Sequence, residues 1–122
     1  MPKLLLEEER PVLEQAAAFI RSQDWSGDYS LIFSGDTLLE LTDKNAGKGA
    51  MVLRLSRRLG IAREHIYCVG DEANDISMLT AARMGFAPEN CVPAVRECGA
   101  RIVSPAWENA LADVVSILDG IY

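Results

Sequence analysis

The second half of the chain alternates short apolar segments with amphipathic ones, and this alternation limits the folds that it can adopt. Three short apolar runs have the character of buried strands, and each is followed by a segment whose apolar residues recur at helical spacing. Strands that alternate with helices are typical of an α/β layer in which helices cover a parallel sheet. We therefore predict strands at 66–69, 85–87 and 101–103 and helices at 75–83, 92–98 and 107–118.

The first part of the chain has a different pattern. A short apolar run at 4–6 precedes a helix whose apolar residues recur between positions 12 and 20. Residues 29–33 and 37–41 have the composition of a hairpin, with turn residues at 34–36 that include Ser34. We expect a small α+β unit that cannot obviously complete a sheet of its own.

A polar, glycine-containing loop after Asp43 separates the two patterns. It leads into an amphipathic helix with Met51 and Leu55 on its apolar side, and Gly60 is a natural stop for that helix. We predict a boundary here, with residues 1–43 forming one unit and 44–122 another.

Composition restricts the class of partner. The 122 residues have the length of one domain, or of pieces of two, and the formal net charge of -6 does not suit a protein that binds a nucleic-acid backbone. No apolar run approaches the roughly 18 residues that span a bilayer. Three cysteines without zinc-ligand spacing fit a reducing compartment. We expect a cytoplasmic protein without nucleic-acid or membrane partners.

Polar residues gather where the first strand of the second half ends, in the stretch "VGDEANDISML". Ligands of α/β sheets bind outside the carboxyl ends of the strands. Asp71, Asn74 and Asp75 could bring hard oxygen atoms together there, as Mg²⁺ requires when a substrate phosphate completes its coordination. Asp71 or Asn74 could instead cap the following helix, and the spacing alone does not decide between these interpretations.

Lys48 lies between two glycines just before the helix that starts the second unit. Its ammonium group could reach a phosphate or a carboxylate cluster, or it could be a solvated loop residue. The surrounding sequence lacks the first glycine and the hydroxyl residue of a P-loop.

Several motifs resemble the carboxyl-terminal part of haloacid dehalogenase (HAD) superfamily phosphatases of the Cof type. They are "EL" at Glu40, "GKGAMVLRL" from Gly47, "VGDEANDISML" from Val69 and "FAPENCVPAVRECGARIV" from Phe86. The resemblance implies a Rossmann-like core, an α/β cap, Mg²⁺ as cofactor and sugar phosphates or other small phosphorylated metabolites as substrates. Residues 1–43 would be the end of the cap, and 44–122 the second half of the core.

The resemblance also assigns roles to residues. Lys48 corresponds to the family lysine that holds the phosphoryl group, and Asp71 to the aspartate that binds Mg²⁺. Asn74 and Asp75 match the pair that supports metal and phosphate. We therefore predict Asp71 and Asp75 at the metal, Lys48 and Asn74 at the phosphate, and Asn90 as a further phosphate contact.

The family's nucleophile motif, Asp-x-Asp-x-Thr, does not occur in the sequence. We expect a fragment of a phosphatase that is inactive by itself, because no aspartyl-phosphate can form without that carboxylate. The strand at 66–69 would then lie at an unpaired sheet edge, which we expect to pair with another copy of the chain or to lead to a rearranged fold.

Two alternatives belong to other classes. The chain could be a non-catalytic α/β module for assembly or binding. A phospho-receiver domain shares the layering but needs a phosphoacceptor aspartate after its third strand, and no aspartate stands there in register.

Overall fold

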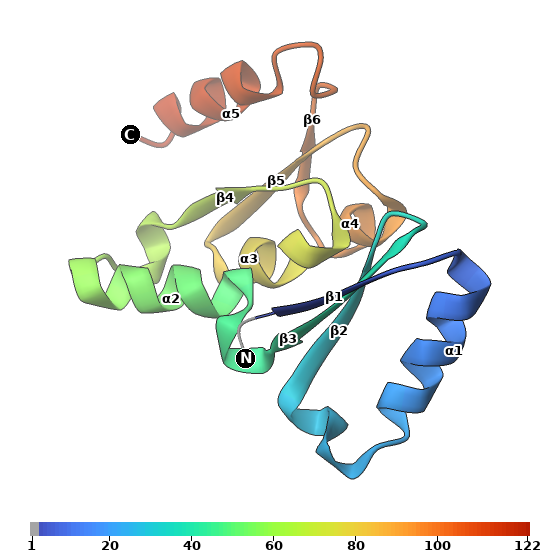
Figure 1. Ribbon diagram of the computed structural model, residues 1–122. Helices are drawn as coiled ribbons and strands as arrows, with labels where there is room; N and C mark the ends of the chain where they lie inside the picture. The colour runs from blue at the N-terminus through green and yellow to red at the C-terminus, as the bar shows by residue number, and fades with distance from the viewer. Residues whose placement is uncertain (1–2) are drawn as a thin grey trace.

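Six strands form two separate three-stranded sheets in the computed structural model, which describes residues 3–122 (Figure 1). One sheet is antiparallel and comes from residues 3–43, whereas the other is parallel and comes from the second half. In chain order the elements are β1 Lys3–Glu7, α1 Arg10–Arg21, η1 Asp24–Asp28, β2 Tyr29–Ser34, β3 Leu38–Asp43, η2 Lys44–Ala46, α2 Lys48–Leu59, η3 Arg63–His65, β4 Tyr67–Val69, η4 Ala73–Asp75, α3 Ile76–Ala81, β5 Met84–Pro88, α4 Pro93–Glu97, β6 Arg101–Val103 and α5 Ala110–Asp119, where η marks short 3-10 turns.

The antiparallel sheet has the strand order β1-β3-β2, which corrects the expectation that the first part of the chain cannot complete a sheet. β3 is the central strand because Leu41 pairs with Leu4 of β1 on one side and with Leu31 of β2 on the other. β2 and β3 form the predicted hairpin, and Gly35 in its turn has a φ of 68°, which glycine adopts without strain. Ser34 ends β2 and is a hairpin residue, as predicted.

The two faces of this sheet have different surroundings. On one face Leu13 and Ala17 of α1 pack against Leu39, and all three are at most 1% exposed. The opposite face carries Glu40 and Thr42 of β3 and looks toward α2 and η4. Figure 1 shows α1 on the side of the antiparallel sheet that lies away from the parallel sheet. The face with polar residues is therefore the one that meets the second half of the chain.

The parallel sheet has the strand order β4-β5-β6 and confirms the predicted α/β layer. Successive residues of β5 point to opposite faces. Phe86 packs with Val114 of α5, while Ala87 packs with Leu79 of α3 and Val95 of α4. The sheet is thus covered on both faces, as parallel sheets require.

β4 pairs with β5 on one side only, so it forms an edge of the sheet within the described chain. Apolar side chains on the two helices that flank it are exposed to solvent: Leu55 and Leu59 of α2, and Leu111 and Val115 of α5, are each between 56% and 66% exposed. Figure 1 shows α2 and α5 on opposite sides of β4. This edge and its flanking apolar residues form a surface that we call the β4 edge surface.

Two further features concern the helices and the cysteines of the described chain. No helix in the described chain combines the length and the apolar character that crossing a membrane requires. Cys68, Cys91 and Cys98 are free, and burial raises the pKa of the Cys68 thiol, so this thiol is a packing residue of the core.

Candidate active site

Lys48 is the first residue of α2, and the packing of this helix on α3 carries it into the site. The N–H of Gly49 donates to Oγ of Ser77 at 3.0 Å. A Cβ atom on Gly49 would lie 2.3 Å from the carbonyl oxygen of Ser77, so the close approach of the two helices requires glycine. The glycines around Lys48 therefore place its ammonium group beside the turn that follows β4.

Asp75 holds that turn together and is only 5% exposed. Its Oδ2 accepts hydrogen bonds from the backbone N–H of Asp71 at 3.0 Å and of Glu72 at 3.1 Å, while Oδ1 accepts a hydrogen bond and ion pair from Nζ of Lys48. A Cβ atom on Gly70 would lie 2.4 Å from Cβ of Asp75. Gly70 is therefore the residue that leaves room for the Asp75 side chain under the turn.

These contacts keep Asp75 ionised. Burial of the carboxyl raises its pKa, but the hydrogen bond from Lys48, the backbone hydrogen bonds from Glu72 and Asp71, and the charge of Lys48 together outweigh burial. The net effect is a pKa below the ordinary value of 3.8. At neutral pH the site thus contains a lysine–carboxylate pair rather than a neutral acid.

Asp71 differs from Asp75 although the two are only four residues apart. It is exposed at the carboxyl end of β4, and no hydrogen bond or ion pair joins its carboxylate to any residue between 3 and 122. The capping interpretation fails for Asp71 and Asn74, because the side chains that cap η4 are those of Glu72 and Asp75. The Asp71 carboxylate is therefore free to bind a ligand.

Asn74 faces the antiparallel sheet. Its Nδ2 donates to Oε2 of Glu40 at 3.4 Å, and the other oxygen of Glu40 accepts from Nζ of Lys3 at 2.8 Å. Glu40 is 8% exposed and was not among the predicted site residues. The sequence gives no local signal for it, since an acid between Leu39 and Leu41 looks like an ordinary solvent-facing position, and only the strand pairing shows that it is buried.

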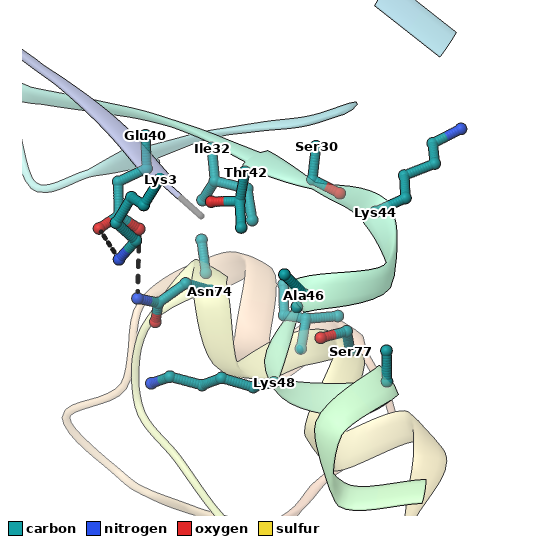
Figure 2. Close-up of a pocket in the computed structure, with 14 residues that line it drawn as sticks. Lys3, Ser30, Ile32, Glu40, Thr42, Lys44, Ala46, Lys48, Asn74 and Ser77 are labelled. Atoms are coloured by element: carbon teal, nitrogen blue, oxygen red, sulfur yellow. Dashed lines mark hydrogen bonds and ion pairs between the residues drawn. The ribbon is translucent and has the colours of Figure 1, made fainter. Parts of the chain in front are cut away.

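A cavity of about 410 Å³ lies between the polar face of the antiparallel sheet and the start of α2 (Figure 2). The sheet supplies Lys3, Glu40 and Thr42, and the second half supplies Lys48 and Asn74. Figure 2 shows the side chains of Lys48 and Asn74 on one side of the cavity and that of Glu40 on the other. The structure therefore brings two of the predicted phosphate ligands together.

The predicted phosphate contact Asn90 lies elsewhere. Its Oδ1 accepts the backbone N–H of Ala106 at 2.8 Å, so it fastens the loop before α5, and it does not line the cavity that holds Lys48. Asp71 opens instead onto a second hollow of about 520 Å³, which Trp107 and Leu111 also line. This second hollow shares no lining residue with the cavity that holds Lys48, and it includes Leu111 of the β4 edge surface.

The donor set fits Mg²⁺ in part. Within residues 3–122 no three acidic, histidine or cysteine side chains come together to hold a metal. Asp71 offers one free carboxylate, which is sufficient for a cation that keeps several waters and takes further oxygens from a phosphate. Asp75 could join as a ligand only by giving up Lys48, because both of its oxygens already have partners.

Fold and site together define an α/β protein with a lysine–carboxylate pair and a free aspartate beyond the carboxyl end of a parallel strand. The family model of haloacid dehalogenase-like hydrolases matches residues 1–115. The chain belongs to this family.

Individual relatives agree with this assignment. Phosphatase YwpJ of Bacillus subtilis is 30% identical over 105 residues, which are 86% of this chain and 37% of YwpJ. The 5-amino-6-(5-phospho-D-ribitylamino)uracil phosphatase YwtE of the same organism is 31% identical over 90 residues, which are 73% of this chain and 32% of YwtE. The chain therefore spans about a third of the length of these curated relatives.

Solved structures show the same fold. A haloacid dehalogenase-like hydrolase from B. subtilis superposes with a TM-score of 0.84 at 27% identity, over 96% of this chain and 40% of that one. The subclass IIB sugar phosphatase BT4131 superposes with a TM-score of 0.81 at 19% identity, over 97% of this chain and 43% of that one. The predicted α/β layer of this superfamily is thus confirmed.

Proposed function

We propose that the chain supplies one half of the active site of a Mg²⁺-dependent phosphatase that acts on sugar phosphates or other small phosphorylated metabolites. The observation that carries this proposal is the Lys48–Asp75 pair together with Asp71, whose backbone N–H donates to Asp75 while its own carboxylate has no partner in the described chain. Phosphoryl transfer depends mainly on positioning and on positive charge, and this arrangement offers both.

Each side chain has a separate task in this proposal. Lys48, which is half exposed, binds the phosphoryl oxygens. Asp75 keeps the ammonium group of Lys48 in place. Asp71 holds Mg²⁺, which neutralises charge on the phosphate when it is bound. Asn74 adds a polar contact from the same turn. Asn90, whose Oδ1 accepts the backbone N–H of Ala106, stays a proposed phosphate contact from the loop after β5.

The nucleophile is the missing component. The sequence has no Asp-x-Asp-x-Thr motif, and we propose that a carboxylate from polypeptide beyond these 122 residues attacks the phosphorus and forms an aspartyl-phosphate. The coverage of about a third of the curated relatives supports this view. In the same proposal residues 1–43 are the end of a cap, residues 44–122 are half of the core, and the protein works in the cytoplasm.

This proposal predicts that the chain alone does not hydrolyse a generic phosphate ester such as p-nitrophenyl phosphate in the presence of Mg²⁺. The reason is that the sequence has no Asp-x-Asp-x-Thr motif to supply the carboxylate that would accept the phosphoryl group. Release of p-nitrophenol, followed by absorbance, should match that of buffer. Turnover that Asp71→Ala abolishes would show that the chain carries a complete active site and would overturn the proposal.

A second candidate function is assembly without catalysis, and the β4 edge surface is the observation that favours it. An edge strand flanked by exposed leucines is a surface that another polypeptide can cover. A second copy of the chain could pair at β4.

If β4 pairs with a second copy, light scattering should give about twice the 13.4 kDa mass of the chain. The variant Leu111→Lys places a charge on the exposed side of α5 and should return the protein to a monomer, whereas Leu5→Lys, at a residue 52% exposed on the other sheet, should not. A monomeric wild-type chain at high concentration would rule out this assembly.

A further inference from the structure

We propose that Glu40 is a positioning residue that fixes the side-chain amide of Asn74 and thereby connects the antiparallel sheet to the phosphate site. The inference rests on the proposed function, because that function is what makes this cavity a phosphate site. The geometry behind it does not depend on the proposed function: Glu40 comes from β3, Asn74 from η4, and the two side chains meet at the edge of the cavity (Figure 2).

The position of Glu40 is an unfavourable one for a carboxylate. Its cross-strand neighbours are Leu5 on β1 and Ile32 on β2, and the residue is 8% exposed. Burying a charge is costly unless that charge is paired and hydrogen-bonded. An apolar side chain would stabilise the sheet more than a carboxylate at this buried position. The contacts of the carboxylate must therefore account for its presence.

Each of the two carboxylate oxygens of Glu40 accepts one hydrogen bond. Oε1 accepts from Nζ of Lys3 at 2.8 Å, and Oε2 accepts from Nδ2 of Asn74 at 3.4 Å. Lys3 compensates the negative charge, since it is about half exposed and adds no buried charge of its own. This leaves the second oxygen of Glu40 to serve Asn74.

Both oxygens of Glu40 act as hydrogen-bond acceptors here, so the carboxylate determines which way the amide faces. Only the amino group of Asn74 can point toward Glu40, because the amide oxygen would be repelled. Figure 2 shows the oxygen of Asn74 directed away from Glu40. That oxygen and the second N–H of the amide therefore remain available on the side of the cavity where Lys48 lies.

Asn74 also shares its turn with Asp75, which holds Lys48. A contact between Glu40 and Asn74 thus links β3 to the turn that organises the whole site. Without Glu40 the amide could rotate and present either its oxygen or its amino group to a ligand. We expect the loss of Glu40 to leave the turn folded while the amide becomes mobile.

The test uses NMR of the uniformly ¹⁵N-labelled chain, with the side-chain NH₂ signals of Asn74 as the reporter. Glu40→Leu removes the acceptor and suits the apolar neighbours, and Glu40→Gln keeps an acceptor oxygen but loses the charge. Thr42→Val is the matched control, because it lies on the same face of β3 and lines the same cavity. Inorganic phosphate with Mg²⁺ serves as the ligand probe.

Glu40→Leu should shift the Asn74 NH₂ signals, make the two protons more alike and weaken phosphate binding about threefold to tenfold, as expected for one hydrogen bond. Glu40→Gln should recover part of both effects, and Thr42→Val should leave the Asn74 signals unchanged. If Glu40→Leu does not fold, the comparison of Glu40→Gln with Lys3→Met still separates the amide contact from the ion pair.

The proposal is overturned if the Asn74 signals of the folded Glu40 variants match those of the wild type. A wild-type chain that binds no phosphate, but whose Asn74 signals respond to Glu40→Leu, would refute the proposed function while supporting the positioning role. The two ideas can therefore fail independently.

Discussion

Gly70→Ala should lower the free energy of unfolding by about 3 kcal/mol, at the upper end of the usual cost of overpacking. The added Cβ would lie 2.4 Å from Cβ and 2.7 Å from Cγ of Asp75. Neither side can yield easily, because the Asp75 carboxylate is held by two backbone N–H groups and by Lys48. Urea unfolding followed by circular dichroism measures the change.

Gly27→Ala is the matched control for this prediction. A Cβ at Gly27 would have no atom within 4 Å, so its effect should stay within about 0.5 kcal/mol. Equal unfolding energies for the two variants would mean that Asp75 does not occupy the space beside Gly70.

Asp75→Ala should lower the free energy of unfolding by about 3 kcal/mol, whereas Asp71→Ala should change it by less than about 0.5 kcal/mol. The first substitution leaves the N–H groups of Asp71 and Glu72 without an acceptor and removes the partner of Lys48. The second removes an exposed carboxylate that has no hydrogen bond or ion pair with any residue between 3 and 122. The same urea experiment compares the two, and similar costs would contradict the different roles that we assign to these aspartates.

The depressed pKa of Asp75 adds a pH dependence to this prediction. A carboxyl group whose pKa is lower in the folded state stabilises the fold above its unfolded pKa, near 3.8, and this contribution is lost as the pH falls through the folded value. The urea concentration at which half of the wild-type protein is unfolded should therefore decrease as the pH is lowered below about 4. Asp75→Asn should reduce this fall, while Asp36→Asn, in an exposed turn, should not. Part of the fall should persist, because hydrogen bonds from Ser104 also lower the pKa of Asp113.

The second half of the fold could be predicted from the sequence because its signals are local. Each strand is a short, largely apolar run, each is followed within a few residues by a helix, and Gly60 ends α2 with a φ of 69°, as its position suggests. The cluster around Asp71 could be located for the same reason, since it follows β4 immediately. Lys48 could be located by its motif. Its contact with Asp75 could not, because that contact depends on the close packing of α2 on α3 that Gly49 permits.

The parts that could not be predicted depend on contacts between distant segments. β1 pairs with β3 through partners such as Lys3 and Thr42, and no local pattern indicates this pairing. The same pairing buries Glu40, which therefore was not recognised as a site residue. The contact of Asn90 with Ala106 could not be predicted for a related reason, since only the folded loop brings the two residues together.

The central claim is that Lys48 and Asp71 form the phosphate and metal half of an active site. NMR titration of the ¹⁵N-labelled chain with MgCl₂ and inorganic phosphate tests it most directly. We expect the backbone signals of Asp71, Asn74 and Lys48 to shift together at millimolar ligand, and we expect Asp71→Asn to abolish the response to Mg²⁺ while Asp36→Asn preserves it. Shifts that are unchanged in Asp71→Asn, or that arise away from this turn, would contradict the claim.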